Sequence, residues 1–304
     1  MKIAVIGAGA MGGVYGAGLS GVPENEVFLI DIWQEHVKEI NENGLQIEEN
    51  EVLKTYKNLK AETDVKKVGI CDMAIIFVKS TDTKEAVEGS LAVFGEDTIA
   101  LTLQNGVGNV EIISEIIGSK NVIAGTTAHG ATVLSAGKMR HAGKGKTVIG
   151  ELDGNDTVRV AKIRDMFEKA GIETEISNNV FGRIWDKLLI NVGINALTGI
   201  TKLRNGELLE HPEIIDIMEK AVTEAMKVAE AKEIKLSFAD PVAQTKNVCV
   251  ATAKNKASML QDILNHRQTE IDMINGAIVR EGSTLGIETP VNSVLTNLIK
   301  FFQK

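Results

Sequence analysis

The segment that most constrains the fold is a glycine-rich turn near the start of the chain, Gly7-Ala8-Gly9-Ala10-Met11-Gly12. It directly follows the apolar run Ile3–Ile6 and opens a helical pattern at Met11. In such a strand–turn–helix unit, the first glycine permits a tight turn, the second lets a pyrophosphate approach the backbone, and the third lets the helix pack on the strand. The N–H groups of the first helical turn then attract phosphate. These six residues are therefore predicted to bind a dinucleotide; the alternative is a glycine turn without a ligand.

An acidic residue ends the second strand-like run of the chain. Asp31 follows Val27–Ile30 and lies 19 residues after Gly12. A carboxylate at this place accepts a hydrogen bond from a ribose hydroxyl and repels a 2′-phosphate, and no arginine follows it at positions 32–34. The sequence therefore favours NADH over NADPH. The alternative is that Asp31 turns outward or caps the helix that begins near Gln34.

The first 125 residues alternate short β-branched runs with longer helical patterns, which predicts an α/β fold with a doubly wound, Rossmann-type sheet. Runs apolar on both faces are expected to be parallel strands at residues 3–6, 27–30, 73–78, 98–101 and 121–124. Helices are expected at 11–19, 34–41, 83–93, 110–117 and 156–170. Three segments separated by glycines, 131–135, 138–141 and 147–149, predict antiparallel strands that extend the sheet, and 172–176 predicts a last strand.

Strand patterns end near Asn178, and the rest of the chain has the apolar spacing of helices. Five helices are expected, at residues 180–200, 212–232, 240–253, 266–285 and 291–302. We therefore predict two domains: a dinucleotide-binding Rossmann domain over 1–178 and an all-helical substrate and dimerisation domain over 179–304.

Composition excludes several classes of function. The chain has 304 residues, 33 Lys and Arg against 41 Asp and Glu, and a net charge of −8 without a dense basic run, so nucleic acid is not an expected partner. No apolar run approaches the roughly 18–20 residues that span a bilayer. Cys71 and Cys249 lie far apart, which predicts no disulfide framework and no metal site and suits a reducing cytoplasm.

Lys187, Asn191 and Asn195 are spaced i, i+4 and i+8, so one helix carries an ammonium and two carboxamides on a single face. Their neighbours are almost all apolar, which predicts that the helix is buried. Desolvation there would lower the pKa of Lys187 and suit it to proton transfer near neutral pH. The alternative is that Lys187 reaches solvent or pairs with a structural carboxylate.

Seven motifs together resemble those of the ketopantoate reductases (2-dehydropantoate 2-reductases), and they span essentially the whole chain. In order they are Gly7-x-Gly9-x-x-Gly12, Val78-Lys79-Ser80, Leu103-Gln104-Asn105-Gly106, Trp185-Asp186-Lys187-Leu188-x-x-Asn191, Asn205-Gly206-Glu207-Leu208, Ser258-Met259-Leu260-Gln261-Asp262 and Thr269-Glu270-Ile271-Asp272-x-x-Asn275-Gly276. By local chemistry alone, Asn105 and Asn205 lie in turn sequences, Lys79 is equally a solvated cation, and Ser258 and Glu270 are surface helix residues.

The resemblance implies reduction of the 2-oxo acid ketopantoate to pantoate by NAD(P)H, on the route to pantothenate and coenzyme A. It implies that Lys187 is the general acid and that Glu270 orients the new hydroxyl or the lysine. Asn191, Asn195, Asn205 and Ser258 would hold the substrate, and Lys79 and Asn105 would lie by the cofactor. The family default is NADPH, whereas Asp31 favours NADH. The apolar helices of the second domain allow a homodimer.

Two other classes of function stay open. A dehydrogenase of the 3-hydroxyisobutyrate type also uses a Lys-x-x-x-Asn pair, usually after a small, glycine-rich helical turn, whereas Ile184-Trp185-Asp186 precedes Lys187 here. The other class is a non-catalytic NAD(P)-sensing protein. Within the reductase class, other branched 2-oxo acids and cyclic imines are alternative substrates.

Overall fold

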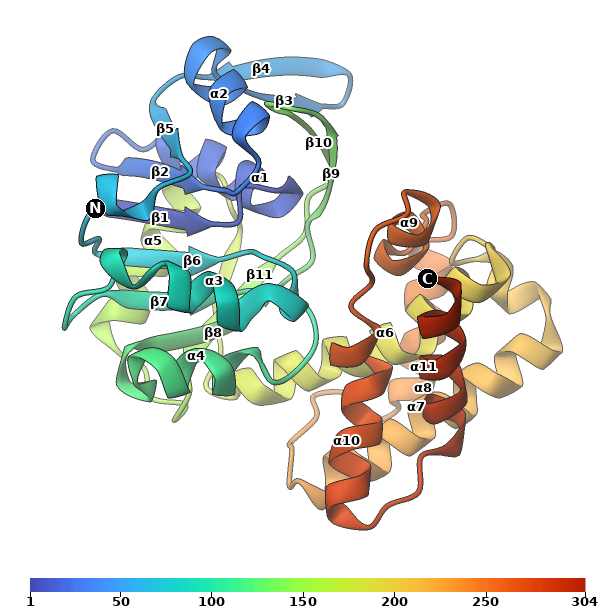
Figure 1. Ribbon diagram of the computed structural model, residues 1–304. Coiled ribbons are helices and arrows are strands. Elements are labelled where there is room, and N and C mark those ends of the chain that lie inside the picture. The colour runs from blue at the N-terminus through green and yellow to red at the C-terminus, as the bar shows by residue number, and fades with distance from the viewer. Residues whose placement is uncertain (304) are drawn as a thin grey trace. The chain divides into compact units, whose positions relative to one another are not determined.

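The computed structural model describes residues 1–303, which form two compact units (Figure 1). The first unit, called the sheet unit below, comprises Met1–Gln104 and Asn109–Val180. The second, called the helical unit, comprises Asn105–Gly108 and the chain from Phe181 onward. Among the helices of residues 1–303, none is both long and apolar enough to cross a membrane.

An eight-stranded sheet in the order β12-β11-β8-β7-β6-β1-β2-β5 forms the centre of the sheet unit. Every neighbouring pair is parallel except β8 and β11. The strands are β1 (Lys2–Ile6), β2 (Glu26–Ile30), β5 (Leu59–Glu62), β6 (Met73–Ile76), β7 (Ile99–Thr102), β8 (Val122–Thr127), β11 (Thr147–Glu151) and β12 (Thr174–Ile176). The order of the first six parallel strands is the one typical of dinucleotide-binding folds, so the predicted fold class is confirmed.

Helices cover both faces of this sheet, as the two-sided apolar pattern of its strands requires. They are α1 (Ala10–Ser20), α2 (Gln34–Asn43), α3 (Thr83–Gly89), α4 (Asn109–Ile117) and α5 (Val158–Lys169). Side chains of α1 and α5, including Tyr15 and Phe167, share one hydrophobic core with the strands. On the opposite face, α3 and α4 pack against each other in front of the sheet (Figure 1).

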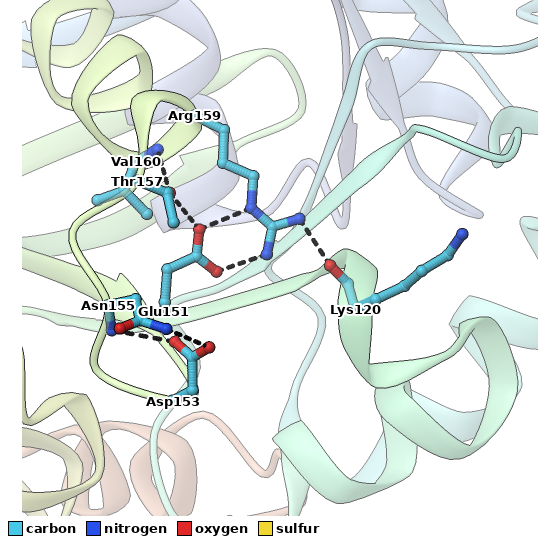
Figure 2. Close-up of polar contacts among 7 residues, drawn as sticks. All are labelled: Lys120, Glu151, Asp153, Asn155, Thr157, Arg159 and Val160. Atoms are coloured by element: carbon cyan, nitrogen blue, oxygen red, sulfur yellow. Dashed lines mark hydrogen bonds and ion pairs between the residues drawn. The ribbon is translucent and has the colours of Figure 1, made fainter.

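A buried carboxylate fixes the start of α5 beside the end of β11 (Figure 2). Glu151 accepts hydrogen bonds from Thr157 Oγ1 and, at 2.7 Å, from Arg159 Nε, while Arg159 Nη1 donates to the Lys120 carbonyl at 2.6 Å. Thr157 is the N-cap of α5. A charge buried at this place is tolerated because it is paired and hydrogen-bonded on both oxygens.

A second, four-stranded sheet in the order β4-β3-β10-β9 corrects part of the sequence prediction. Its strands are β3 (Leu45–Glu49), β4 (Val52–Tyr56), β9 (Gly130–Ser135) and β10 (Lys138–Gly143). We expected β9 and β10 to extend the main sheet, but of the three segments only β11 does so. β3, β4 and β5 were not predicted; of these, β4 is exposed nearly throughout and shows no apolar alternation.

The helical unit has a hydrophobic core of its own. Its helices are α6 (Val180–Thr201), α7 (Pro212–Ala231), α8 (Pro241–Ala251), α9 (Ser258–Leu264), α10 (Asn275–Leu285) and α11 (Pro290–Phe302). Three prolines lie in the first turns of α7, α8 and α11, where the missing N–H breaks no helical bond. The helix expected from residue 266 to 285 is wrong in its first half, since α10 begins at Asn275. Before it lies only the short 3₁₀ helix η6 (Ile271–Met273), and α9 is a separate helix.

Candidate active site

The glycine-rich segment forms a tight connection between β1 and α1. Gly7 has a φ of +94°, and a Cβ on it would lie 2.6 Å from the backbone nitrogen of Val78. A Cβ on Gly12 would lie 1.9 Å from the Gly7 carbonyl oxygen, whereas a Cβ on Gly9 would meet no described atom within 4 Å. The open side at Gly9, the N-cap of α1, fits a pyrophosphate approaching the first helical turn.

Asp31 turns toward the glycine-rich segment and does not point outward. Its Oδ2 accepts a hydrogen bond from the Ala8 backbone nitrogen at 2.9 Å. Its Oδ1 accepts from the nitrogen of Trp33, the residue that precedes α2, at 3.0 Å. Each carboxylate oxygen has further acceptor capacity, so these bonds orient Asp31 and leave it able to accept from a ribose hydroxyl.

Lys79 follows β6, the strand next to β1 in the sheet. It is half-buried and directly precedes the short 3₁₀ helix η2 (Ser80–Asp82). The neighbouring Val78 nitrogen lies against Gly7, so this loop runs beside the glycine-rich turn. The carboxyl ends of β1, β2 and β6 therefore bring the glycines, Asp31 and Lys79 to one edge of the sheet.

Asn105 belongs to the helical unit, although the family resemblance led us to expect it beside the cofactor. Its Nδ2 donates to Glu270 Oε2 at 3.2 Å. Two further features fix this approach: the Val107 nitrogen donates to the Met273 carbonyl at 3.2 Å, and Gly106 has a φ of +80° with room only for hydrogen against that carbonyl. The contact between Asn105 and Glu270 was not predicted from the sequence.

Lys187, Asn191 and Asn195 all lie on the single continuous helix α6, as their spacing predicts. Burial lowers the pKa of Lys187 to about 8, against the opposing effect of the Glu270 carboxylate, which raises it. A lysine with this pKa exists in both protonation states near neutral pH and can deliver a proton to a developing alkoxide. Glu270 lies at the N-terminal boundary of η6, so it is not the surface helix residue that its local sequence suggests.

Two of the candidate carboxamides have buried polar atoms without a hydrogen-bond partner among the described residues. These atoms are Nδ2 of Asn195, whose side chain is on α6, and Oδ1 of Asn205, in the loop that follows. Asn205 uses its other amide atom to donate to Thr252 Oγ1 at 2.8 Å. Buried polar groups are rarely left unsatisfied, so a donor and an acceptor in this state point to a polar ligand.

The remaining two candidates differ in burial. Asn191 lies one helical turn before Asn195 and is half-buried, whereas Ser258 is exposed at the first position of α9. The sequence analysis missed Asp186, which is buried beside Lys187 and accepts hydrogen bonds from the Ser237 nitrogen at 3.1 Å and from the Ser237 hydroxyl. A carboxylate inside an otherwise apolar helical run was the available signal.

A βαβ unit with this glycine turn and with an acid at the end of its second strand defines a dinucleotide-binding protein. Comparison with known families gives the particular group. The family model described as "Ketopantoate reductase PanE/ApbA" matches residues 3–154, and that described as "Ketopantoate reductase PanE/ApbA C terminal" matches residues 179–303. The chain therefore belongs to the ketopantoate reductase family, as its motifs predict.

Individual relatives agree over the full length. The chain is 34% identical to a 2-dehydropantoate 2-reductase of Halobacterium salinarum, covering 100% of this chain and 99% of the relative. It is 35% identical to one of Pyrococcus horikoshii, covering 99% and 97%. The family and these relatives do not favour the hydroxyisobutyrate-type dehydrogenase or the non-catalytic sensor.

Two solved structures resemble this chain over its whole length. D-mandelate dehydrogenase in complex with NADH and anilino(oxo)acetate has a TM-score of 0.94 and 32% identity, covering 100% of this chain and 98% of that one. A PanE/ApbA family ketopantoate reductase from Ralstonia eutropha JMP134 has a TM-score of 0.91 and 33% identity, with the same coverage.

Proposed function

We propose that this chain is an NAD(P)H-dependent 2-dehydropantoate 2-reductase, which reduces the ketone of ketopantoate to the alcohol of pantoate. The observation that carries the proposal is Lys187, whose pKa is lowered to about 8 on a helix that also carries two carboxamides. The full-length relatives named 2-dehydropantoate 2-reductase support the substrate. The place of the reaction is then the synthesis of pantothenate and coenzyme A.

A nicotinamide dinucleotide held by Gly7–Gly12 and Asp31 would supply the hydride for the carbonyl carbon. Lys187 donates the proton that neutralises the carbonyl oxygen, so that alcohol forms and the lysine is left neutral until it takes a proton from solvent. Glu270 orients the lysine or the new hydroxyl, and its charge keeps a larger fraction of Lys187 protonated.

Asn191, Asn195, Asn205 and Ser258 are proposed to hold the hydroxyl and carboxylate of the substrate. The free Nδ2 of Asn195 can donate to a carboxylate or carbonyl oxygen, and the free Oδ1 of Asn205 can accept from a hydroxyl. Neutral carboxamides position an acid without cancelling the charge of the ammonium that must give up its proton.

The glycine-rich segment Gly7–Gly12 and Asp31 are proposed to bind the cofactor, with Lys79 and Asn105 beside it. We propose NADH as the preferred cofactor, although NADPH is the family default. The support is the Asp31 carboxylate, which two backbone nitrogens hold in place and which would repel a 2′-phosphate. D-mandelate dehydrogenase, a structural neighbour, has been solved with NADH.

We assign cofactor binding and substrate binding to the two predicted domains. Residues 1–178 would bind the dinucleotide, and residues 179–304 would bind the substrate and form a homodimer. An exposed apolar strip on α11, formed by Val294, Leu298, Phe301 and Phe302, supports such a contact between copies. Light scattering on the wild type and on Leu298→Glu tests the dimer.

Both cysteines are buried as free thiols, which suits a cytoplasmic protein.

A second candidate substrate is a bulkier, aryl-substituted 2-oxo acid. The likeness to D-mandelate dehydrogenase favours it, since that structure resembles the model as closely as a ketopantoate reductase does. The chemistry would be unchanged, because the same proton donor serves any 2-oxo acid. Only the groups around the carbon chain of the substrate would differ.

A reduction assay separates these possibilities. Ketopantoate, phenylglyoxylate and a branched 2-oxo acid are each offered with NADH and with NADPH, and cofactor oxidation is followed by absorbance. We expect the highest kcat/KM with ketopantoate and NADH. A higher kcat/KM with phenylglyoxylate would show that an aryl-substituted 2-oxo acid is the preferred substrate. A preference for NADPH would contradict the proposed preference for NADH. Absence of turnover with every acid would contradict the reductase itself.

A further inference from the structure

Ala8, the residue between the first two glycines of the turn, has both of its backbone polar atoms bonded to side chains. Its nitrogen donates to Asp31 Oδ2 at 2.9 Å. Its carbonyl oxygen lies 3.0 Å from Nε2 of His36, a buried residue of α2. Ala8 is itself fully buried, so the peptide units on its two sides are fixed by two different side chains.

The hydrogen bonds of His36 define its protonation state. The backbone nitrogen of Gly137 lies 2.9 Å from His36 Nδ1, and since a backbone N–H can only donate, Nδ1 must be the acceptor. The proton is therefore on Nε2, which donates to the Ala8 carbonyl. The ring of Trp33 stacks on the imidazole with 5.0 Å between centroids and 10° between planes. His36 is thus neutral and held in one tautomer.

Gly137 lies at the turn between β9 and β10, so His36 connects the second sheet to the glycine-rich segment. Gly137 has a φ of +66°, and a Cβ on it would lie 2.5 Å from Cγ of Glu39 on α2. Its carbonyl accepts from the Gln46 nitrogen at 2.8 Å, at the start of β3. The hairpin turn is therefore pressed against α2 and fixed to β3.

The same hairpin supports α1. Met139 on β10 is fully buried, and its Cε would lie 2.5 Å from a Cβ on Gly13. The glycine in the first turns of α1 thus permits close packing on the second sheet, in addition to the packing of Gly12 on β1. The second sheet therefore contacts both the helix and, through His36, the turn before it.

Peptide planarity explains why the Ala8 carbonyl matters. The carbonyl of Ala8 and the N–H of Gly9 belong to one trans peptide unit, so they point in opposite directions. A hydrogen bond from His36 to that carbonyl directs the Gly9 N–H away from α2. Gly9 is the N-cap of α1, where backbone N–H groups meet a pyrophosphate.

We propose that His36 is a positioning residue for the nicotinamide cofactor, which fixes the Ala8–Gly9 peptide for the pyrophosphate and makes the β9–β10 hairpin part of the binding apparatus. The inference rests on the proposed binding of a dinucleotide by the glycine-rich segment. It goes beyond that proposal because His36 and Gly137 lie outside the glycine motif and act only through Ala8.

The test is the variant His36→Phe, which keeps an aromatic ring against Trp33 and removes both hydrogen bonds. Loss of a buried hydrogen bond should raise the Kd for NADH and NADPH by roughly tenfold or more. The Kd for ADP-ribose should rise by the same factor, because ADP-ribose retains the pyrophosphate and lacks the nicotinamide. The kcat at saturating cofactor should stay within about twofold of wild type, since chemistry at Lys187 is untouched.

Asn41→Leu is the matched control. Asn41 is also on α2, donates to the Ala61 carbonyl at 2.8 Å and accepts from the Ala61 nitrogen at 2.9 Å, so it makes the same two kinds of bond, toward β5. We expect a lower Tm and an unchanged cofactor Kd. His36→Gln, which retains a donor and an acceptor, should recover part of the affinity lost in His36→Phe and covers a failure of that variant to fold.

Three outcomes would overturn the inference. One is an unchanged Kd in folded His36→Phe, another is an equal rise of Kd in Asn41→Leu, and a third is a His36→Gln variant no better than His36→Phe. Failure of the proposed function is distinguishable, because the wild type would then bind neither the dinucleotides nor ADP-ribose, and both claims would fail together.

Discussion

The proposed cofactor site and the proposed substrate site obtain their specificity in opposite ways. In the sheet unit, the proposed cofactor site is formed largely by backbone, and the side chains that orient it are already bonded within the protein: Asp31 to Ala8 and Trp33, and His36 to Ala8 and Gly137. In the helical unit, the proposed substrate site is made of side chains. There a lysine has a lowered pKa, and polar atoms of Asn195 and Asn205 are buried without a partner among the described residues.

This difference indicates how much folding free energy each unit gives up to form its proposed site. A backbone site whose orienting groups are all bonded is rigid before the ligand arrives, so little free energy is lost on binding. An unsatisfied buried polar atom costs about 1–3 kcal/mol of folding free energy, which a ligand recovers when it binds. The sheet unit is therefore expected to tolerate loss of its ligand well, whereas the helical unit is expected to gain stability when its polar groups are removed.

The largest expected effect is on the chemical step. Lys187→Ala removes the proposed proton donor and should lower kcat by roughly 10²–10⁴-fold, while the Kd for the cofactor, whose proposed site is in the sheet unit, stays near wild type. Steady-state kinetics and cofactor titration on the same preparation measure both. Lys227→Ala, at an exposed position of α7, is the control and should change neither. Equal loss in both variants would contradict the comparison.

The next largest effect is on the preference between NADH and NADPH. Asp31→Asn keeps an oxygen acceptor toward the Ala8 nitrogen and removes the charge that repels a 2′-phosphate. The ratio of kcat/KM for NADPH to that for NADH should therefore rise by roughly tenfold. Measuring kcat/KM with each cofactor at saturating 2-oxo acid gives the ratio. A ratio equal to that of the wild type would show that Asp31 does not select the cofactor.

A third effect separates substrate binding from stability at the proposed substrate site. Asn195→Leu removes an unsatisfied buried donor, so the free energy of unfolding should rise by about 1 kcal/mol while the KM for the 2-oxo acid increases roughly tenfold. Urea unfolding and steady-state kinetics measure the two quantities. A fall in stability would indicate that the Asn195 amide is satisfied within the protein.

Asn292→Leu is the matched control for this stability effect. The Asn292 amide is fully buried and donates to the Ala221 carbonyl at 2.9 Å and to Glu224 Oε2 at 2.7 Å. Its loss leaves the buried Glu224 carboxylate with fewer donors, so the free energy of unfolding should fall by about 2–3 kcal/mol.

The smallest expected effect is a shift of a pH profile. A general acid must be protonated, so reduction is lost as the pH rises through the pKa of Lys187, about 8. The Glu270 carboxylate raises this pKa, so Glu270→Gln should lower it and move the descending limb of kcat/KM to lower pH. An unmoved limb, or a limb moved to higher pH, would contradict the electrostatic role of Glu270.

Features that depend on local sequence could be predicted. The glycine turn, the parallel strands other than β5, and α6 follow from a turn with defined steric needs, from short apolar runs and from the helical period of 3.6 residues. The spacing of Lys187, Asn191 and Asn195 could be interpreted because a helix of this length places positions i, i+4 and i+8 on one face. The family motifs gave the remaining candidate residues their proposed roles.

Features that depend on contacts between residues far apart in the sequence could not be predicted. Asn105 and Glu270 are separated by 165 positions, and no local pattern indicates that they meet. The second sheet pairs β3 with β10, whose partners Gln46 and Lys138 are also far apart in sequence, which is why β9 and β10 were assigned to the wrong sheet. The helix expected before Asn275 failed because Ile271 and Ile274 keep helical apolar spacing in a segment that is only a 3₁₀ turn.

The most direct test of the central claim is a single-turnover measurement of ketopantoate reduction by the wild type with NADH already bound, followed from pH 6 to pH 10. Binding steps then do not limit the rate, so the profile reports the proton donor itself. We expect a rate that is constant at low pH and falls tenfold per pH unit above about 8, the pKa of Lys187. A rate that stays constant up to pH 10 would contradict proton donation by Lys187.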